Sequence, residues 1–307
     1  MSVRFEHIRA EVFRKPWAIL PEKLEVIAAL VEMRAAGERF SDVEVRERIG
    51  AGPRVSVKGP GAVAVIPIHG VISQRMNLMS QISGGTSIEK LQTNFRQALA
   101  DPNVKAILFD VDSPGGAVDG VPEMSAEIIA SRKQKRTVAV ANTMAASAAY
   151  WLASAASELY VTPSGSVGSV GVYAAHEDLS AAAEADGVKV TLVSAGKYKV
   201  DGNPYEPLSE SARNDLQAKV DEFYGMFVKS VAKGRGASQE AVREGFGQGR
   251  MVLAADAVGA GMADGVATLD EALAKMGAAR PAEMMAEAPA RPTLAALRRD
   301  LDLREQV

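Results

Sequence analysis

Residues 137–156 have the sequence TVAVANTMAASAAYWLASAA, and this stretch decides the fold. Its first part, Thr137 to Asn142, is an apolar run typical of a buried strand, and an alanine-rich helix is predicted to end near Ala156. Ser147 therefore lies about where a strand turns into a helix, between side chains too small to cover its hydroxyl. The next backbone N–H at such a junction can stabilise developing negative charge, which suits a serine nucleophile. The alternative is a small residue in a packed helix, because serine is common at helix starts.

Apolar runs and amphipathic helices alternate along the rest of the core. Strands are predicted at 62–68, 71–72, 106–111, 158–162, 169–174 and 189–193, and helices at 88–100, 121–132, 177–186 and 209–234, with two further helical units around 249–252. Residues 73–86 and 194–208 are polar and rich in glycine or proline, which predicts irregular loops. Strands that alternate with helices across short glycine-bounded loops predict an α/β fold with a mostly parallel sheet.

Three regions are predicted along the chain. Residues 1–60 form an N-terminal helical appendage and linker, with a short apolar anchor at 16–21 and an amphipathic helix at 22–36. Residues 61–276 form the core, and residues 277–307 form a mobile tail or interaction segment. The N-terminus carries charges throughout, and no window reaches about 18 consecutive apolar residues. The protein is therefore expected to be soluble and cytoplasmic, without a membrane anchor.

Composition excludes several classes of site. The chain has 307 residues, a formal net charge of −3 and no cysteine, which excludes disulfides, thiolate metal sites and a cysteine nucleophile. Acidic and basic residues are mixed without a basic stripe, so nucleic acid is not an expected partner. The three histidines, His7, His69 and His176, lack the spacing of a zinc motif. A Ser-His-Asp triad would have to use one of them, but neither His69 nor His176 lies in a recognisable motif.

A glycine turn precedes the serine segment. The run Asp112-Ser113-Pro114-Gly115-Gly116 follows a predicted strand, and its glycines leave backbone N–H groups accessible. Gly115 or Gly116 could donate to an oxyanion together with the N–H of Ala148. Taken by itself, a Pro-Gly-Gly run is more often a simple tight turn.

A lysine motif follows the serine segment. The run Gly196-Lys197-Tyr198-Lys199-Val200-Asp201 offers a base for a serine, since a lysine can accept a proton when burial disfavours its ammonium form. Lowering a lysine pKa from about 10.4 to about 7–8 costs roughly 3–4 kcal/mol, which requires a dry pocket with little nearby negative charge. Taken by itself, a loop lysine is more often a solvated surface residue.

Together these motifs resemble the signal peptide peptidase A family of Ser-Lys proteases, and most closely its phage capsid-maturation branch. The resemblance covers about residues 16–276 and includes a fourth motif, Gly165-Ser166-Val167-Gly168-Ser169-Val170-Gly171-Val172. It implies a crotonase/Clp-like α/β superhelix and a homo-oligomer. It also implies Ser147 as the nucleophile, Lys199 as the general base and Ser169 as the serine that orients the lysine, with no metal or organic cofactor.

The same resemblance assigns the oxyanion donors to the Gly115-Gly116 turn and Ala148, and leaves Lys197 at the surface. Membrane-bound members carry a glycine pair after the nucleophile, where this chain has Ala148-Ala149, and they carry an N-terminal anchor that is not expected here. Both differences favour the phage branch over signal-peptide cleavage.

The implied function is endopeptidase action through an acyl-enzyme on capsid or scaffold proteins during prohead maturation, with the chain itself as a further candidate substrate. This function requires Lys199 to be buried within hydrogen-bond reach of Ser147 and held by Ser169. Two alternatives stay open. One is a crotonase-type acyl-CoA hydratase or isomerase that uses carboxylates such as Glu123. The other is a catalytically inert capsid scaffold or assembly protein whose tail carries the function.

Overall fold

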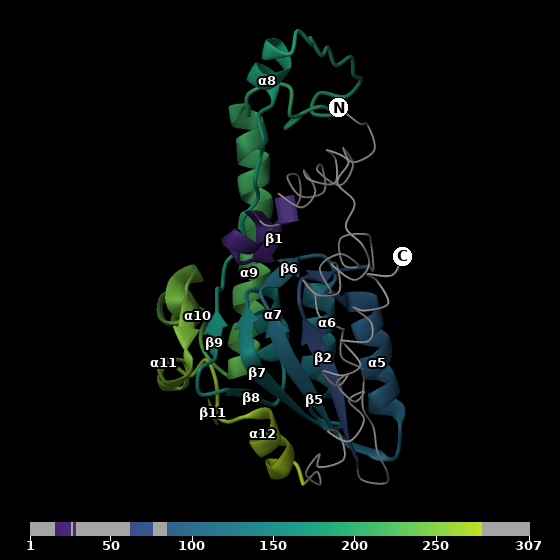
Figure 1. Cartoon of the computed structure of the whole chain (residues 1–307), viewed down its shortest axis with the longest axis vertical. Helices are drawn as coiled ribbons and strands as arrows, with labels where there is room; N and C mark the ends of the chain where they lie inside the picture. Colours follow the sequence, from purple (N-terminus) through teal and green to yellow (C-terminus); the bar gives the residue numbers. More distant parts are fainter. Residues whose placement is uncertain (1–15, 26, 29–61, 76–84, 278–307) are drawn as a thin grey trace, which may run out of the picture.

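The computed structural model of the chain describes residues 16–25, 27–28, 62–75 and 85–277 (Figure 1). Within these ranges a seven-stranded sheet forms the centre of the body, with the order β10-β9-β7-β5-β2 and with β8 between β7 and β11. The strands are β2 (Ala62–His69), β5 (Val104–Ser113), β7 (Arg136–Ala146), β8 (Glu158–Val161), β9 (Ser166–Gly168), β10 (Met251–Leu253) and β11 (Gly265–Val266).

Most strand pairs of this sheet are parallel. β5 pairs parallel with β2 and β7, β7 pairs parallel with β8 and β9, and β11 pairs parallel with β8. Only β10 runs antiparallel, against β9, among the described strands of this sheet. The predicted fold class, α/β with a mostly parallel sheet, is confirmed.

The two faces of the sheet are covered unequally. One face carries Ile66, Phe109 and Ala139 into the main core, beneath α5 (Ile88–Ala100), α6 (Val121–Ser131), α7 (Ala148–Ala153) and the C-terminal half of α9 (Glu210–Arg235). The opposite face carries Leu108 and Val138 against the shorter α12 (Leu269–Lys275). The strands are apolar on both faces because both are buried, as expected for a parallel sheet.

Serine residues cap the starts of two helices. The side chain of Ser87 accepts a hydrogen bond from the N–H of Lys90 at the start of α5, and that of Ser209 accepts one from Ala212 at the start of α9. Gly236 ends α9 in the left-handed conformation that glycine adopts without strain. α10 (Gln239–Gly245) and α11 (Ala254–Gly259) are the two helical units predicted around residues 249–252.

A second, smaller sheet joins segments that are far apart in the sequence. Its order is β1-β6-β3-β4, from β1 (Trp17–Ile19), β6 (Gly115–Ala117), β3 (Ile72–Ser73) and β4 (Thr86–Ser87). The predicted apolar anchor at residues 16–21 thus contains a buried strand, and the N-terminal region is tied to the core through it. Residues 21–25 and 27–28 are helical, and the remainder of the predicted helix and linker lies outside the described residues.

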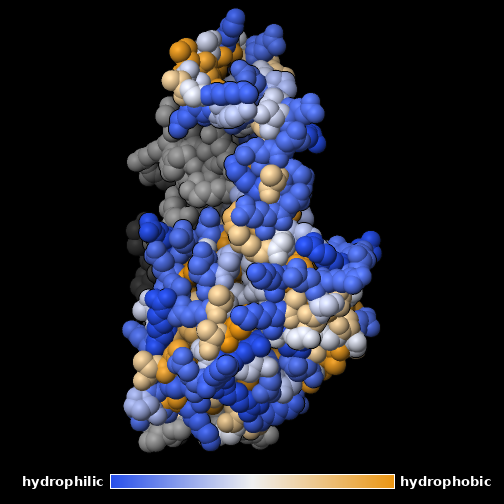
Figure 2. Space-filling model, turned by 180° about the vertical axis from the view of Figure 1, so that it is seen from behind, coloured by the Kyte–Doolittle hydropathy of each residue, from blue (hydrophilic) through white to orange (hydrophobic). Residues whose placement is uncertain are grey.

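An arm projects from the body (Figure 1). It consists of α8 (Ser180–Ala185), the irregular segment 186–207 and the N-terminal half of α9. The strand predicted at 189–193 is wrong, because no neighbouring strand pairs with this segment in the described chain. Its apolar side chains are exposed instead, and Figure 2 shows hydrophobic residues gathered at the tip of the arm.

The strand predicted at 169–174 is also wrong. The extended chain ends at Gly168, where φ is +122°, and Ser169 has φ of +51°, so the backbone leaves the sheet at this point. Only Tyr173 forms an isolated bridge, to Trp17, within the predicted range. Residues 76–84 and the tail at 278–307 lie outside the described residues. None of the described helices is both long and apolar enough to cross a membrane.

Candidate active site

Ser147 occupies the junction between β7 and α7. Its φ of +54° and ψ of −117° are rare for a residue with a side chain and indicate local backbone strain. The backbone is held from both sides, since its N–H donates to the carbonyl of Gly168 at 2.7 Å and its carbonyl accepts from Trp151 at 2.9 Å. The hydroxyl donates to the carbonyl of Gly171 at 3.4 Å. The predicted position of Ser147 at a strand-to-helix turn is thus found.

The helix that starts after Ser147 is anchored at several points. All six residues of α7 are buried, and the alanines allow close approach to the sheet. Trp151 stacks on Phe227 of α9 with ring centroids 4.4 Å apart. The Tyr150 hydroxyl donates to the carbonyl of Met262 at 3.0 Å, and burial raises the pKa of this phenol. The helix N-terminus beside Ser147 therefore has a fixed position.

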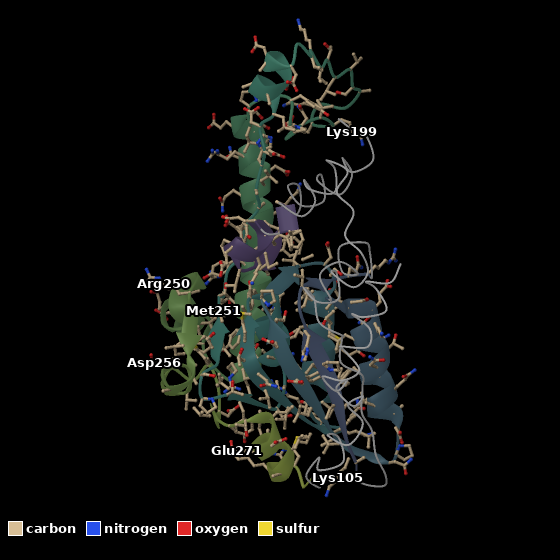
Figure 3. The ribbon with its side chains drawn as sticks, in the orientation of Figure 1. Lys105, Lys199, Arg250, Met251, Asp256 and Glu271 are labelled. Carbon is tan, nitrogen blue, oxygen red and sulfur yellow. The ribbon has the colours of Figure 1, made fainter. Side chains whose placement is uncertain are left out.

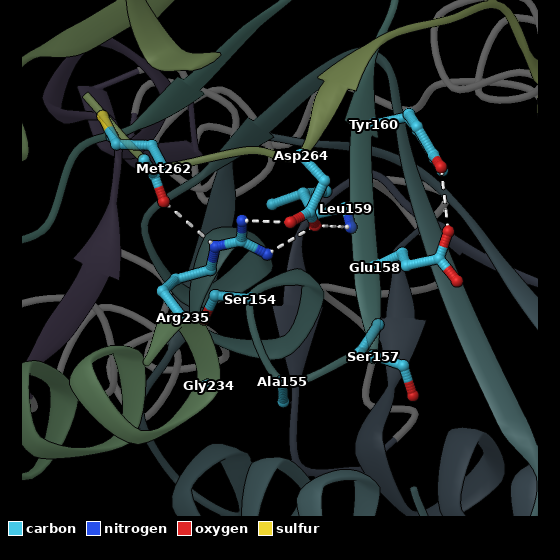
Figure 4. Close-up of polar contacts among 12 residues, drawn as sticks. Ser154, Ala155, Ser157, Glu158, Leu159, Tyr160, Gly234, Arg235, Met262 and Asp264 are labelled. Carbon is cyan, nitrogen blue, oxygen red and sulfur yellow. Dashed lines mark hydrogen bonds and ion pairs between the residues drawn. The ribbon is translucent and has the colours of Figure 1, made fainter. Parts of the chain in front are cut away.

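Arg132 holds the far end of α7, and a second arginine lies beside it. The Arg132 guanidinium donates to the carbonyls of residues 154, 155, 156 and 234, which terminate α7 and α9, and burial lowers its pKa. Next to it, Arg235 forms an ion pair with Asp264, whose carboxylate also accepts from the N–H of Leu159 (Figure 4). Burial acts to raise the pKa of Asp264, but these hydrogen bonds hold it below its ordinary value.

The glycine turn is shaped by a local hydrogen-bond network. Ser113 Oγ donates to the carbonyl of Gly70 at 2.6 Å and accepts from the N–H of Gly115 at 3.2 Å. Gly115 has φ of +98°, which favours glycine. At Gly116 a Cβ would lie 1.9 Å from the carbonyl oxygen of Ile72, so only glycine fits beside β3.

The predicted oxyanion donors differ in whether their backbone N–H groups already have a hydrogen-bond partner. Ala148 is the first residue of α7, so its N–H has no partner within the helix. The N–H of Gly115 is engaged by Ser113, and Gly116 is paired with Ala18 of β1. Hydrogen-bonded and non-hydrogen-bonded residue pairs alternate along an antiparallel pair of strands. Because the N–H of Leu20 donates to the Pro114 carbonyl, the pair two residues away, Ala18 and Gly116, is also hydrogen-bonded, and the N–H of Gly116 points at Ala18.

Ser169 adjoins a residue that is bonded to the nucleophile. It follows Gly168, whose carbonyl accepts the Ser147 N–H, and its own N–H donates to the carbonyl of Arg250 at 2.8 Å. The residue is buried and its left-handed backbone turns the chain away from β9. The structure thus brings together Ser147, Ala148, Ser169 and the glycine turn.

Lys199 does not join this group within the single chain. The side chain is exposed, contrary to the prediction of a buried lysine beside Ser147, and Figure 3 places it near the tip of the arm, away from α7. The physical reason is that the lysine loop is carried by the arm, which the core does not cover. Lys197 is also exposed, with its amine 4.8 Å from the ring centroid of Tyr198, so exposure does not distinguish the two lysines.

Other catalytic arrangements receive no support from the described residues. His69 Nε2 lies 3.2 Å from Asp110, and His176 contacts the carbonyl of Asn203 on the arm, whereas the Ser147 hydroxyl bonds to a backbone carbonyl. Within the described ranges no group of three or more histidine, aspartate or glutamate residues could hold a metal ion. Glu123, the carboxylate considered for a hydratase, is exposed on the first turn of α6.

The segment at residues 16–21 was not predicted to lie beside the site. Trp17 exchanges backbone hydrogen bonds with Tyr173, at 2.7 and 3.0 Å, and Leu20 donates to the carbonyl of Pro114 in the glycine turn. The apolar run between Pro16 and Pro21 was a signal for buried packing, but nothing in its sequence pointed to Ser147.

Comparison with known proteins identifies the family of the chain. The family model described as "Peptidase family S49" matches residues 129–282, which are 154 of the 307 residues and include Ser147, Ser169 and Lys199. The chain belongs to peptidase family S49. The predicted resemblance to the Ser-Lys proteases of the signal peptide peptidase A type is confirmed.

Several named S49 relatives are similar to this chain. It is 36% identical to capsid assembly protease C of Escherichia phage lambda over 73% of this chain and 51% of that protein. It is 33% identical to head-tail preconnector protein GP5 of Enterobacteria phage P21 over 79% and 51%, and 30% identical to protease 4 of Salmonella typhi over 70% and 34%. The chain therefore spans about half the length of the phage relatives it matches.

Among solved structures, a serine-to-alanine mutant of the 1510-N membrane-bound stomatin-specific protease is similar to the chain. The match has a TM-score of 0.45 and 18% identity, and covers 71% of this chain and 86% of that one.

Proposed function

We propose that this chain is a serine endopeptidase that acts through an acyl-enzyme on Ser147. The observation that carries the proposal is the strained strand-to-helix junction of an S49 chain, where the serine adjoins the N–H of Ala148 and the glycine turn. A lysine takes the proton of the Ser147 hydroxyl, and the oxygen attacks the scissile carbonyl. The oxyanion is stabilised by the Ala148 N–H and the glycine turn. The lysine then protonates the leaving amine and activates the water that releases the acyl group.

The base in this proposal is Lys199 of a neighbouring copy of the chain, which makes the active protein a homo-oligomer. Two observations support it: Lys199 is exposed on a projecting arm, and the arm tip exposes apolar side chains such as Val193, which is 94% exposed. Docking of this tip onto another copy would bury apolar surface and desolvate the amine, which favours its neutral form. Ser169, buried beside Ser147, would hold the amine by a hydrogen bond.

The proposed substrates are capsid or scaffold proteins processed during prohead maturation. The support is the similarity to a protein named capsid assembly protease in phage lambda. Trimming of the chain's own tail at residues 277–307 belongs to the same proposal. The inert-scaffold and hydratase alternatives lack a specific structural observation in their favour.

The first experiment compares the purified chain with its Ser147→Ala and Lys199→Ala variants, using a phage capsid protein and the chain itself as substrates and mass spectrometry as the readout. Both variants should fold and lose cleavage. Full activity of Lys199→Ala would exclude this lysine as the base, and an inactive parent chain would favour the inert scaffold.

A mixing experiment tests the neighbouring-copy assignment. Each inactive variant retains the residue that the other lacks, so a 1:1 mixture reassembled from dissociated subunits should recover about a quarter of wild-type activity, because half the sites retain Ser147 and half of these receive Lys199. A dyad formed within one chain would recover no activity in the mixture.

A further inference from the structure

β1 is held between two segments that adjoin Ser147, the glycine turn on one side and Tyr173 on the other. It pairs antiparallel with β6, with Trp17 opposite Ala117, Ala18 opposite Gly116 and Ile19 opposite Gly115. Its other edge is bonded to Tyr173 through both backbone groups of Trp17. A short extended segment of the chain is therefore held between the glycine turn and the segment that follows Ser169.

The same strand passes directly beside the nucleophile. A Cβ built on Gly115 would lie 2.2 Å from the carbonyl oxygen of Ala18 and 3.0 Å from that of Ala146, the residue before Ser147. On the other side, Tyr173 lies two residues beyond Gly171, whose carbonyl accepts the Ser147 hydroxyl. β1 is therefore flanked by the glycine turn, which lies next to Ala146, and by the segment of Gly171 and Tyr173, which bonds to Ser147.

The site is closed in this state. Ser147 is 1% exposed, and Trp17, Ala18 and Ile19 are 3%, 0% and 2% exposed. The backbone N–H of Gly116, a candidate oxyanion donor, is directed at Ala18 rather than left open. Because Ser147 is buried, a substrate carbonyl cannot reach its Oγ from solvent until segments around the site move.

We propose that β1 is a pseudo-substrate strand, which occupies the peptide-binding groove of its own active site and must leave before a substrate strand can bind. This proposal rests on the proposed peptidase function of Ser147. Extended peptides bind to exposed strand edges through main-chain hydrogen bonds, with alternate side chains entering pockets. The edge of β6 that faces Tyr173 offers such main-chain hydrogen bonds, and β1 forms them.

The side chains of β1 indicate what the groove accepts. Trp17 and Ile19 pack on one side, against Leu24, Ile27 and Ala117, while Ala18 points to the opposite side and belongs to the main core. Leu24 and Ile27 follow β1 along the chain, so they can move away with it. The core residues that surround Ala18 belong to the body and stay in place. The groove therefore selects a small residue at that position of an extended peptide.

A reversible lock on β1 tests the proposal. Trp17 and Ala117 face each other as a non-hydrogen-bonded antiparallel pair, for which a Cα separation of about 4.5 Å is expected, and this lies within the range for a disulfide. The chain has no cysteine, so Trp17→Cys/Ala117→Cys introduces a unique pair. The Ser147→Ala background separates binding from catalysis, and the probe is a fluorescent peptide with the sequence of residues 16–21, Pro-Trp-Ala-Ile-Leu-Pro, measured by anisotropy.

The reduced double variant should bind the probe at least about tenfold more tightly than the oxidised form of the same protein, because the locked strand cannot leave the groove. A probe with an N-methylated alanine, which cannot donate the strand hydrogen bond, should not bind, and the single variant Trp17→Cys should show no redox effect. Equal binding by the oxidised and reduced forms, or no binding by either, would overturn the proposal. If binding responds to the lock but the Ser147-containing chain cleaves no peptide, the groove assignment stands and the peptidase assignment fails.

Discussion

Gly116→Ala is the substitution that most directly tests whether the glycine turn positions the oxyanion site. The added methyl carbon would lie 1.9 Å from the carbonyl oxygen of Ile72 and 2.6 Å from its carbonyl carbon. An ordinary contact begins near 3.4 Å, so β6 or β3 has to move by about 1.5 Å. These clashing atoms are backbone atoms, which cannot rotate away as a flexible side chain can.

This displacement has two expected consequences. Forced overpacking lowers the free energy of unfolding by about 1–3 kcal/mol. A shift of about 1 Å in a catalytic group can lower the rate about 100-fold, so kcat for peptide cleavage should fall by that order. The measurements are urea unfolding followed by circular dichroism, and steady-state cleavage of a fluorogenic peptide by the folded variant.

Gly234→Ala provides a matched control at a distance from the turn. Its added Cβ would lie 2.3 Å from the carbonyl oxygen of Ser154, so it creates a similar backbone clash where α9 crosses the end of α7. This variant should lose stability to a similar extent and retain kcat within a factor of about three. If Gly116→Ala loses stability but keeps its kcat, the glycine turn does not position the oxyanion and the reasoning is refuted.

Three further predictions concern the supports of the site. Ser169→Ala should lower kcat by about 10–100-fold and shift the pH profile of kcat, while the free energy of unfolding changes by less than about 1 kcal/mol; an unchanged profile would remove Ser169 from the role of holding the base. Arg132→Met should lower the free energy of unfolding by about 3 kcal/mol, since four carbonyls lose a charged donor. The control Arg75→Met, at an exposed ion pair, should lower it by less than about 1 kcal/mol. Equal losses would contradict the capping role of Arg132. Asp264→Asn should cost about 1–3 kcal/mol at pH 7 by weakening the pair with Arg235. Because the pKa of Asp264 is held below its ordinary value in the folded state, its contribution is present above about pH 4 and lost as the pH falls through the folded pKa, so denaturation at pH 3 should show a smaller difference between Asp264→Asn and the parent.

Local patterns predicted most of the core. The apolar runs of β2, β5 and β7 and the helices α5 and α9 depend on near neighbours in the sequence, and each was found close to its expected range. The turn at Ser147 was likewise predicted, because an apolar strand followed by small residues leaves little choice at that junction. The two wrong strands, at 169–174 and 189–193, were apolar enough for a sheet, but neither belongs to a strand of the described sheets, and Tyr173 forms only an isolated bridge to Trp17.

The sequence by itself determined the α/β class, the junction at Ser147, and the identity of the glycine, serine and lysine motifs, since these depend on local backbone preferences and on residue chemistry. Only the tertiary structure decided which motifs meet. It brought Ser169 and the glycine turn to the segments beside Ser147 through strand pairing, left Lys199 exposed on the arm, and placed Trp17 to Ile19 between the glycine turn and Tyr173. The physical reason is that strand pairing joins segments about 20 to 100 residues apart through backbone groups that every residue carries, so no local pattern encodes the choice of partner.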